Sequence, residues 1–111
     1  MNPSDILTTD YSEGFDVIRK NLIKQSYYKY GPASENFRTG NVDAVGCMKK
    51  CLAKFEETGN TEYLADLANY CMFRYMWPQK GEYFRHTESN ESAGIDGISI
   101  KEIEVYLSES V

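Results

Sequence analysis

The chain has 111 residues, 41% of them hydrophobic and 26% charged, and a formal net charge of −5 at pH 7. These values predict one small globular domain and exclude both wholesale disorder and a second independent core. Its apolar runs are shorter than the roughly 20 residues of a membrane-spanning helix, and the N-terminus has no basic region leading into an apolar stretch. We therefore expect a cytoplasmic protein.

The first predicted helix covers about residues 11–30. A capping box that begins at Asp10, or Ser12 as an alternative cap, provides its start. Gly31 and Pro32 provide its end, because glycine favours the left-handed cap and proline cannot continue a helix. Apolar residues at spacings of three and four predict its packed stripe: Phe15, Ile18 and Leu22.

A second helix is predicted over about residues 41–58, after a connector formed by residues 33–40. It begins near Asn41, whose side chain can cap the first amides, and it ends before Gly59. Four apolar residues at spacings of three and four predict the packed seam of this helix: Val45, Met48, Leu52 and Phe55.

A third helix is predicted over about residues 61–77, because Pro78 disfavours helical geometry in the residue before it. Its predicted apolar face consists of four residues: Leu64, Ala68, Cys71 and Tyr75. The second and third helices are separated by very few residues, so they should lie antiparallel as an αα-hairpin. The first helix is expected to close the core against this hairpin.

The remaining chain predicts a long polar loop over residues 78–98 and a short helix over residues 99–108, which a capping box from Ser99 to Glu102 begins. The fold class is therefore predicted to be all-α: a single small domain of three to four helices, built on an antiparallel hairpin, with a long polar loop before the C-terminal helix.

The charge is distributed unevenly along the sequence. Residues 1–81 carry ten acids and ten bases, whereas residues 82–111 carry seven acids and only Arg85 and Lys101. An acidic segment repels phosphate and attracts basic protein surfaces, so nucleic-acid binding is not expected. The simpler interpretation of this segment is a solvated acidic tail.

Three residues of the third predicted helix share one sector of its surface: Glu62, Asp66 and Asn69. Two carboxylates and an amide at this spacing could hold Mg²⁺, which prefers oxygen ligands. The simpler interpretation is a solvated face with its acids near the helix N-terminus. Phe73 shares the sector, which indicates that this face also touches another helix or a partner.

The three cysteines and the single histidine form a second candidate group: Cys47, Cys51, Cys71 and His86. Four such ligands could bind Zn²⁺, but structural zinc sites usually have short paired spacings. Cysteine on an apolar helix face is more often packed in the core. We therefore expect no metal cofactor, apart from Mg²⁺ under the alternative above, and we expect reduced thiols because three is an odd number.

The polar loop contains the third group, a candidate contact for an anion or a partner protein: Tyr83, Arg85, His86, Thr87, Ser89 and Ser92. A guanidinium, an imidazole and hydroxyl groups could hold a phosphate. Glu88 and Glu91 oppose an anion site, and no recognised phosphate loop is present. A flexible polar connector is the remaining alternative.

The segments EETGNTEYLADLANYCMFRYMWP (residues 56–78) and HTESNESAG (residues 86–94) resemble small proteins of phages and bacterial mobile elements. The resemblance covers about residues 27–94, and its motifs are ETGN, EYL, D-x-A-N and M-x-P, followed by a loop with histidine and serines. It implies a small helical protein and brings no defined activity.

A more distant resemblance links the chain to the MazG-like all-α nucleoside triphosphate pyrophosphohydrolases. Those enzymes pair an E-E-x-x-E helix with an E-x-x-D helix to hold Mg²⁺. Here Glu62-x-x-x-Asp66 departs from the second spacing, and residues 47–50, Cys-Met-Lys-Lys, stand where the first acids belong. The resemblance is therefore incomplete.

Two functions remain as hypotheses. The preferred one is a non-catalytic binding protein of mobile-element type that inhibits or regulates a host factor such as a defence system, with a protein as partner and homo-oligomers also possible. Its candidate contact tyrosines are Tyr27, Tyr28, Tyr70 and Tyr83. The alternative is a Mg²⁺-dependent nucleotide hydrolase or nucleotide-binding protein with Glu62 and Asp66 on the metal.

Overall fold

The structure, a computed structural model, describes residue 2 and residues 5–97. The described chain forms four α-helices and a short 3₁₀ turn: α1 (Glu13–Tyr30), α2 (Ala33–Phe37), α3 (Ala44–Thr58), α4 (Glu62–Met76) and η2 (Ser89–Glu91). The predicted all-α class is confirmed for these residues, which contain no strand. The helix predicted over residues 99–108 lies outside the described residues.

Side-chain caps decide where α1 and α3 begin. The Ser12 hydroxyl accepts a hydrogen bond from the Phe15 amide at 3.0 Å, so Ser12 and not Asp10 caps α1. The start of α3 was predicted near Asn41, but Asp43 caps this helix, and its carboxylate accepts from the Val45 amide at 3.1 Å. A carboxylate also interacts favourably with the positive end of the helix dipole.

The predicted connector over residues 33–40 is wrong in its first half, because residues Ala33–Phe37 form α2. Pro32 stands at its N-cap with a φ of −61°, the angle to which its ring restricts it. The Asn36 amide donates a hydrogen bond to the Tyr30 carbonyl at 3.3 Å, which ties α2 to the end of α1. A helix of five residues is too short to show a 3.6-residue period.

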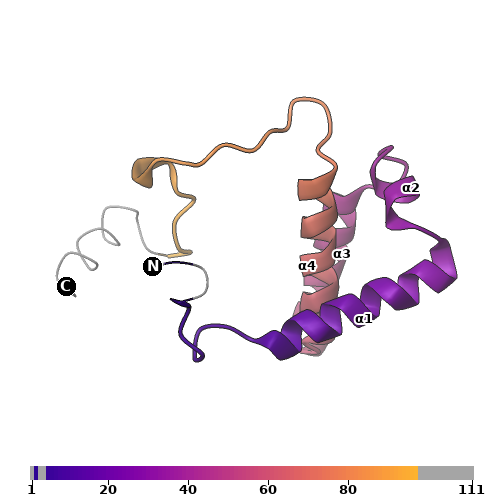
Figure 1. The fold of residues 1–111 in the computed structure, drawn as a ribbon, viewed down its shortest axis with the longest axis horizontal. Helices are drawn as coiled ribbons and strands as arrows, with labels where there is room; N and C mark the ends of the chain where they lie inside the picture. The colour runs from indigo at the N-terminus through magenta and orange to yellow at the C-terminus, as the bar shows by residue number, and fades with distance from the viewer. Residues whose placement is uncertain (1, 3–4, 98–111) are drawn as a thin grey trace.

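Helices α3 and α4 form the predicted antiparallel hairpin, and α1 crosses it while α2 folds back at the far end of α1 (Figure 1). Gly59 turns the chain between the two hairpin helices. Its φ of 75° lies in the left-handed region, and its amide donates to the Phe55 carbonyl at 2.7 Å. Only glycine adopts this conformation without strain.

The described core is very small and lies mainly along α4. Its buried apolar residues are Ala44, Ala65 and Phe73, and Asn69 is buried among them with 5% of its surface exposed. Phe73 carries most of the apolar area, because the other two side chains are single methyl groups.

The predicted buried face of α4 is only partly right. Leu64 and Ala68 are half-buried, but Cys71 and Tyr75 are exposed, whereas the sector that contains Asn69 is buried. Helix α4 contacts α3 on one side and α1 and α2 on another, so two of its faces are covered. The sector of Asp66, Asn69 and Phe73 meets α1 and α2, so the contact indicated by Phe73 is present and the interpretation of a solvated face holds only for Glu62.

The packed face of α1 differs in part from the predicted stripe, of which Leu22 is half-buried and the other two residues are exposed. Phe15 and Ile18 are 39% and 50% exposed. The contact with α4 is instead made around Arg19, whose guanidinium lies 3.4 Å from the Asn69 side-chain oxygen. A polar pair occupies the centre of this helix crossing, so apolar periodicity alone misplaces the contact.

Arg74 fixes the end of α4 to the beginning of the long loop. Its guanidinium donates two hydrogen bonds of 2.7 Å to the Glu82 carboxylate, which also accepts from the Gln79 amide at 3.0 Å. Asp43 at the start of α3 lies 3.6 Å from the same guanidinium. Two parallel bonds of this kind are a strong and directional ion pair.

This ion pair predicts a pH dependence of stability. The Arg74 guanidinium and the Gln79 amide lower the pKa of Glu82 from its usual 4.5 to about 2. Ionised Glu82 therefore stabilises the folded state fully above pH 4.5, and this contribution is lost as the pH falls towards 2. In Glu82→Gln we expect a smaller fall in melting temperature between pH 6 and pH 3 than in the wild type, measured by circular dichroism.

The matched control for that measurement is Glu57→Gln, which removes an exposed carboxylate paired with Lys54 at 3.5 Å. Its melting temperature should fall between pH 6 and pH 3 by as much as that of the wild type, because exposed pairs of this kind contribute little to stability. If the melting temperatures of Glu82→Gln and Glu57→Gln fall by the same amount over this pH range, the Arg74–Glu82 pair does not contribute to the pH dependence of stability.

No helix in the described part of the chain is both long enough and apolar enough to cross a membrane.

Candidate functional site

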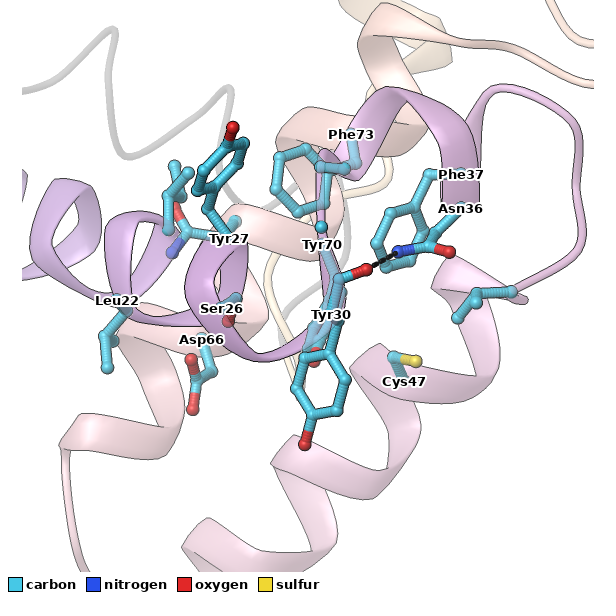
Figure 2. A pocket seen from close by; sticks show the side chains of 15 residues that line it. Leu22, Ser26, Tyr27, Tyr30, Asn36, Phe37, Cys47, Asp66, Tyr70 and Phe73 are labelled. Carbon is cyan, nitrogen blue, oxygen red and sulfur yellow. Dashed lines mark hydrogen bonds between the residues drawn. The ribbon is translucent and has the colours of Figure 1, made fainter.

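A pocket of about 480 Å³ lies where α1, α2 and α4 meet, with Cys47 of α3 at its edge. Five aromatic side chains line it: Tyr27, Tyr30, Phe37, Tyr70 and Phe73. We call it the aromatic pocket. Figure 2 shows these rings in the middle of the view, with Asp66 and Cys47 on opposite sides of them. Its volume and its apolar lining are typical of ligand pockets.

The turn between α1 and α2 creates the pocket. Gly31 has a φ of 78°, and its amide donates to the Tyr27 carbonyl at 2.9 Å, which ends α1 and redirects the chain. The Val42 amide donates to the Asn36 carbonyl at 3.0 Å and returns the chain to α3. Helix α2 thus contacts both the end of α1 and α4, and the aromatic pocket lies between the three helices.

The aromatic rings form a continuous cluster along α4. The Phe37 ring lies 4.9 Å from that of Phe73 and 5.7 Å from that of Tyr70, between ring centroids. Trp77 stacks on the other side of Phe73 at 5.8 Å. Burial, with smaller contributions from nearby titratable groups, raises the pKa of Tyr70 to about 12, so its hydroxyl is neutral at pH 7.

The amides of the pocket are already occupied by contacts within the protein. Asn69 donates a hydrogen bond of 3.0 Å to the Arg19 carbonyl and accepts one of 3.4 Å from the Arg19 guanidinium. The Asn36 amide donates to the Tyr30 carbonyl. These contacts position the helices and use both polar ends of the Asn69 amide and the nitrogen of the Asn36 amide.

Asp66 is the one charged side chain in the lining of the aromatic pocket. It is half-buried, and no ion pair or hydrogen bond joins its side chain to another described residue. Burial, and then the nearby charge of Glu62, raises the pKa of Asp66 above its usual range. A carboxylate in this position favours a cationic or hydrogen-bond-donating ligand.

The predicted metal ligands Glu62, Asp66 and Asn69 occupy three different environments. Glu62 is exposed at the start of α4, Asp66 lines the aromatic pocket, and the Asn69 amide is bound to Arg19. Among the residues that the structure describes, no three His, Cys, Asp or Glu side chains are grouped closely enough to hold a metal ion.

The cysteines divide between two sides of the hairpin. Burial raises the pKa of Cys47 and of Cys51 above the usual value, so both remain protonated thiols at pH 7. Cys71 is exposed, and its sulfur lies 3.6 Å from the sulfur of Met48. His86 packs edge-to-face on Phe84 in the loop, with 5.0 Å between ring centroids.

The chain after α4 runs away from α1, α2 and α3 (Figure 1), and none of the loop residues predicted as contacts lines the aromatic pocket. Arg85 pairs with Glu91, which also accepts a hydrogen bond of 3.0 Å from the Glu88 amide. Six predicted contact residues are all exposed: Tyr83, Arg85, His86, Thr87, Ser89 and Ser92. Their contact role stays a prediction, and the guanidinium is held by a carboxylate of its own loop.

Sequence reasoning named Asp66 and Asn69 but missed that they border a pocket, and it missed Tyr30 and Phe37 altogether. The signal available was the Gly31-Pro32 pair. A sharp turn at the end of a long amphipathic helix, followed by a short segment that ends in an aromatic residue, can fold back over the neighbouring helix.

No protein-family model matches the chain, and no curated protein or solved structure is significantly similar to it. Its function is therefore inferred from its own geometry.

Proposed function

We propose that the chain is a binding protein with no catalytic role, and that its aromatic pocket receives an anchoring side chain from a partner protein. The observation that carries this proposal is the pocket itself: about 480 Å³, lined mainly by aromatic and aliphatic side chains. Anchors of protein interfaces commonly fill desolvated pockets of this kind.

The polar groups of the aromatic pocket support binding over catalysis. The Asn36 and Asn69 amides are used within the protein, and the Tyr70 hydroxyl and the Cys47 thiol are neutral at pH 7. General acid–base chemistry needs a donor and an acceptor poised near neutral pH. Asp66 alone does not supply such a pair, so binding is the simpler role.

The resemblance of residues 27–94 to small phage and mobile-element proteins supports a particular kind of partner. A host protein that the chain inhibits or regulates, for example a component of a defence system, fits this proposal. The exposed loop residues Tyr83 and Arg85 supply a second contact surface for the same partner.

Photo-crosslinking from the pocket rim tests the proposal. Tyr27 lines the aromatic pocket and is 55% exposed, so benzoylphenylalanine at this position faces an incoming side chain. In a bacterial lysate we expect one discrete cross-linked protein, and we expect Ser26→Trp, which fills the pocket from an exposed position, to abolish it. Mass spectrometry identifies the product.

The matched control places the same cross-linker at Val17, which is 57% exposed on α1 and does not line the pocket. Its products should be weak, and Ser26→Trp should not alter them. Identical products from positions 17 and 27, or a Tyr27 product that persists in Ser26→Trp with an unchanged circular dichroism spectrum, would show that the pocket is not the binding site.

A further inference from the structure

The lining of the aromatic pocket contains an acidic side chain and no basic one. Figure 2 draws its 15 lining side chains, and they include the Asp66 carboxylate but no lysine, arginine or histidine. Lys20 and Lys24 border a separate hollow on the outer side of Tyr27. An anionic group in the aromatic pocket would therefore meet a carboxylate, and the Arg19 guanidinium beside Asn69 is already paired with Asp16.

The titratable side chains around Asp66 give it no counter-charge. Glu62, Tyr70 and Cys51 interact with its charge, and Cys47, Tyr27 and Tyr30 are the other titratable residues of the pocket lining. None of these side chains can carry a positive charge. Helix α2 contributes only uncharged lining residues: Ala33, Asn36 and Phe37. A half-buried carboxylate without a partner is costly, and a ligand cation would remove that cost.

The aromatic rings favour the same kind of ligand. The face of an aromatic ring carries partial negative charge and attracts an ammonium or guanidinium group within about 6 Å of its centre. Five rings line this pocket. They also offer apolar surface to the aliphatic stem of a lysine or an arginine, which commonly lies against such surface while its charged end finds a polar partner.

We propose that the aromatic pocket receives a lysine or arginine side chain of the partner protein, with its stem against the rings and its charged end beside Asp66. This inference rests on the proposed function. The net charge of −5 and the acid-rich residues 82–111 add long-range attraction for a basic protein segment. The same features disfavour a nucleotide or another anion in the pocket.

Four blocked pentapeptides that differ only in their central residue test the inference: Gly-Gly-X-Gly-Gly with lysine, arginine, norleucine or glutamate at X. Norleucine keeps the apolar stem of lysine and lacks its charge. Binding is followed by amide chemical shifts at Asp66, Asn69 and Tyr70, and by the fluorescence of Trp77, the single tryptophan, which stacks on Phe73. We expect the lysine and arginine peptides to bind at least about fivefold tighter than the norleucine peptide, and the glutamate peptide not to bind.

The Asp66→Asn variant keeps the size of the side chain and removes its charge. It should lower the affinity of the lysine peptide towards that of the norleucine peptide, with the rings still attracting the ammonium group, and leave the norleucine peptide unchanged. Glu62→Gln is the control, because Glu62 lies on the same helix but outside the pocket lining. It should change the lysine affinity much less.

The outcomes separate this inference from the proposed function. Equal binding of the lysine and norleucine peptides, with shifts in the pocket, overturns the basic anchor but leaves an apolar anchor and the binding role intact. Absence of binding by all four peptides overturns the basic anchor, while the Tyr27 cross-link decides the binding role independently. If free n-butylammonium binds as tightly as the lysine peptide, the ligand of the pocket is a small amine, and the proposal that the cation belongs to a partner protein is wrong.

Discussion

Phe73→Ala is expected to lower the free energy of unfolding by about 3–5 kcal/mol, the largest effect of any single truncation in the described chain. Phe73 is 8% exposed and contacts Phe37, Tyr70 and Trp77, with ring centroids 4.9 to 6.3 Å away. The other buried apolar residues of the described chain are Ala44 and Ala65, so no other truncation removes as much buried apolar surface. Thermal unfolding should show a melting temperature lower by roughly 15 °C or more.

Phe84→Ala removes the same atoms from an exposed site and is the control. Phe84 is 66% exposed, and among the aromatic residues that the structure describes its ring contacts those of Tyr75 and His86. Its truncation should cost about 1 kcal/mol or less. Equal losses in Phe73→Ala and Phe84→Ala would mean that the cluster on α4 does not stabilise the fold.

The helices and the hairpin could be predicted from the sequence because their signals are local. Gly59 ends α3, Pro78 follows the end of α4, and Ser12 caps α1. Caps and breakers act on their own helix, and very few residues between two helices leave an antiparallel arrangement as the simplest solution. These boundaries agree with the structure to within a few residues.

The rotation of each helix about its axis could not be predicted in the same way. Apolar periodicity places Phe15 and Ile18 in the core, yet the α1–α4 contact is centred on Arg19 and Asn69. A polar pair that satisfies itself across two helices is invisible to a count of apolar residues. Its two members are 50 positions apart, so neither indicates the other in a single sequence.

The candidate site follows from the same contact. Sequence reasoning recognised that Phe73 shares a sector with Glu62, Asp66 and Asn69 and that this face touches another element. The structure supplies that element: α1 and α2 cover the sector and leave the aromatic pocket between them. A face that combines carboxylates with a large aromatic residue is better read as one side of a pocket than as a solvated surface.

Asn69→Ala is expected to lower the free energy of unfolding by about 1–3 kcal/mol. Asn69 is 5% exposed, and its amide holds both the main-chain carbonyl and the guanidinium of Arg19. Its removal breaks the polar link between α1 and α4 and leaves the Arg19 carbonyl and guanidinium without their Asn69 partner. Chemical denaturation measures the loss, and Asn21→Ala, at an exposed position of α1, should change stability by about 0.5 kcal/mol or less.

Asn69→Leu separates the hydrogen bonds from the volume of the side chain. Leucine fills a similar space, so any loss of unfolding free energy in Asn69→Leu comes mainly from the unpaired polar groups of Arg19. We expect this variant also to be less stable than the wild type. Because Asn69 also lines the aromatic pocket, a looser α1 should weaken binding of the lysine peptide even though the Asp66 carboxylate is still present. A leucine variant as stable as the wild type would show that packing alone holds α1 on α4.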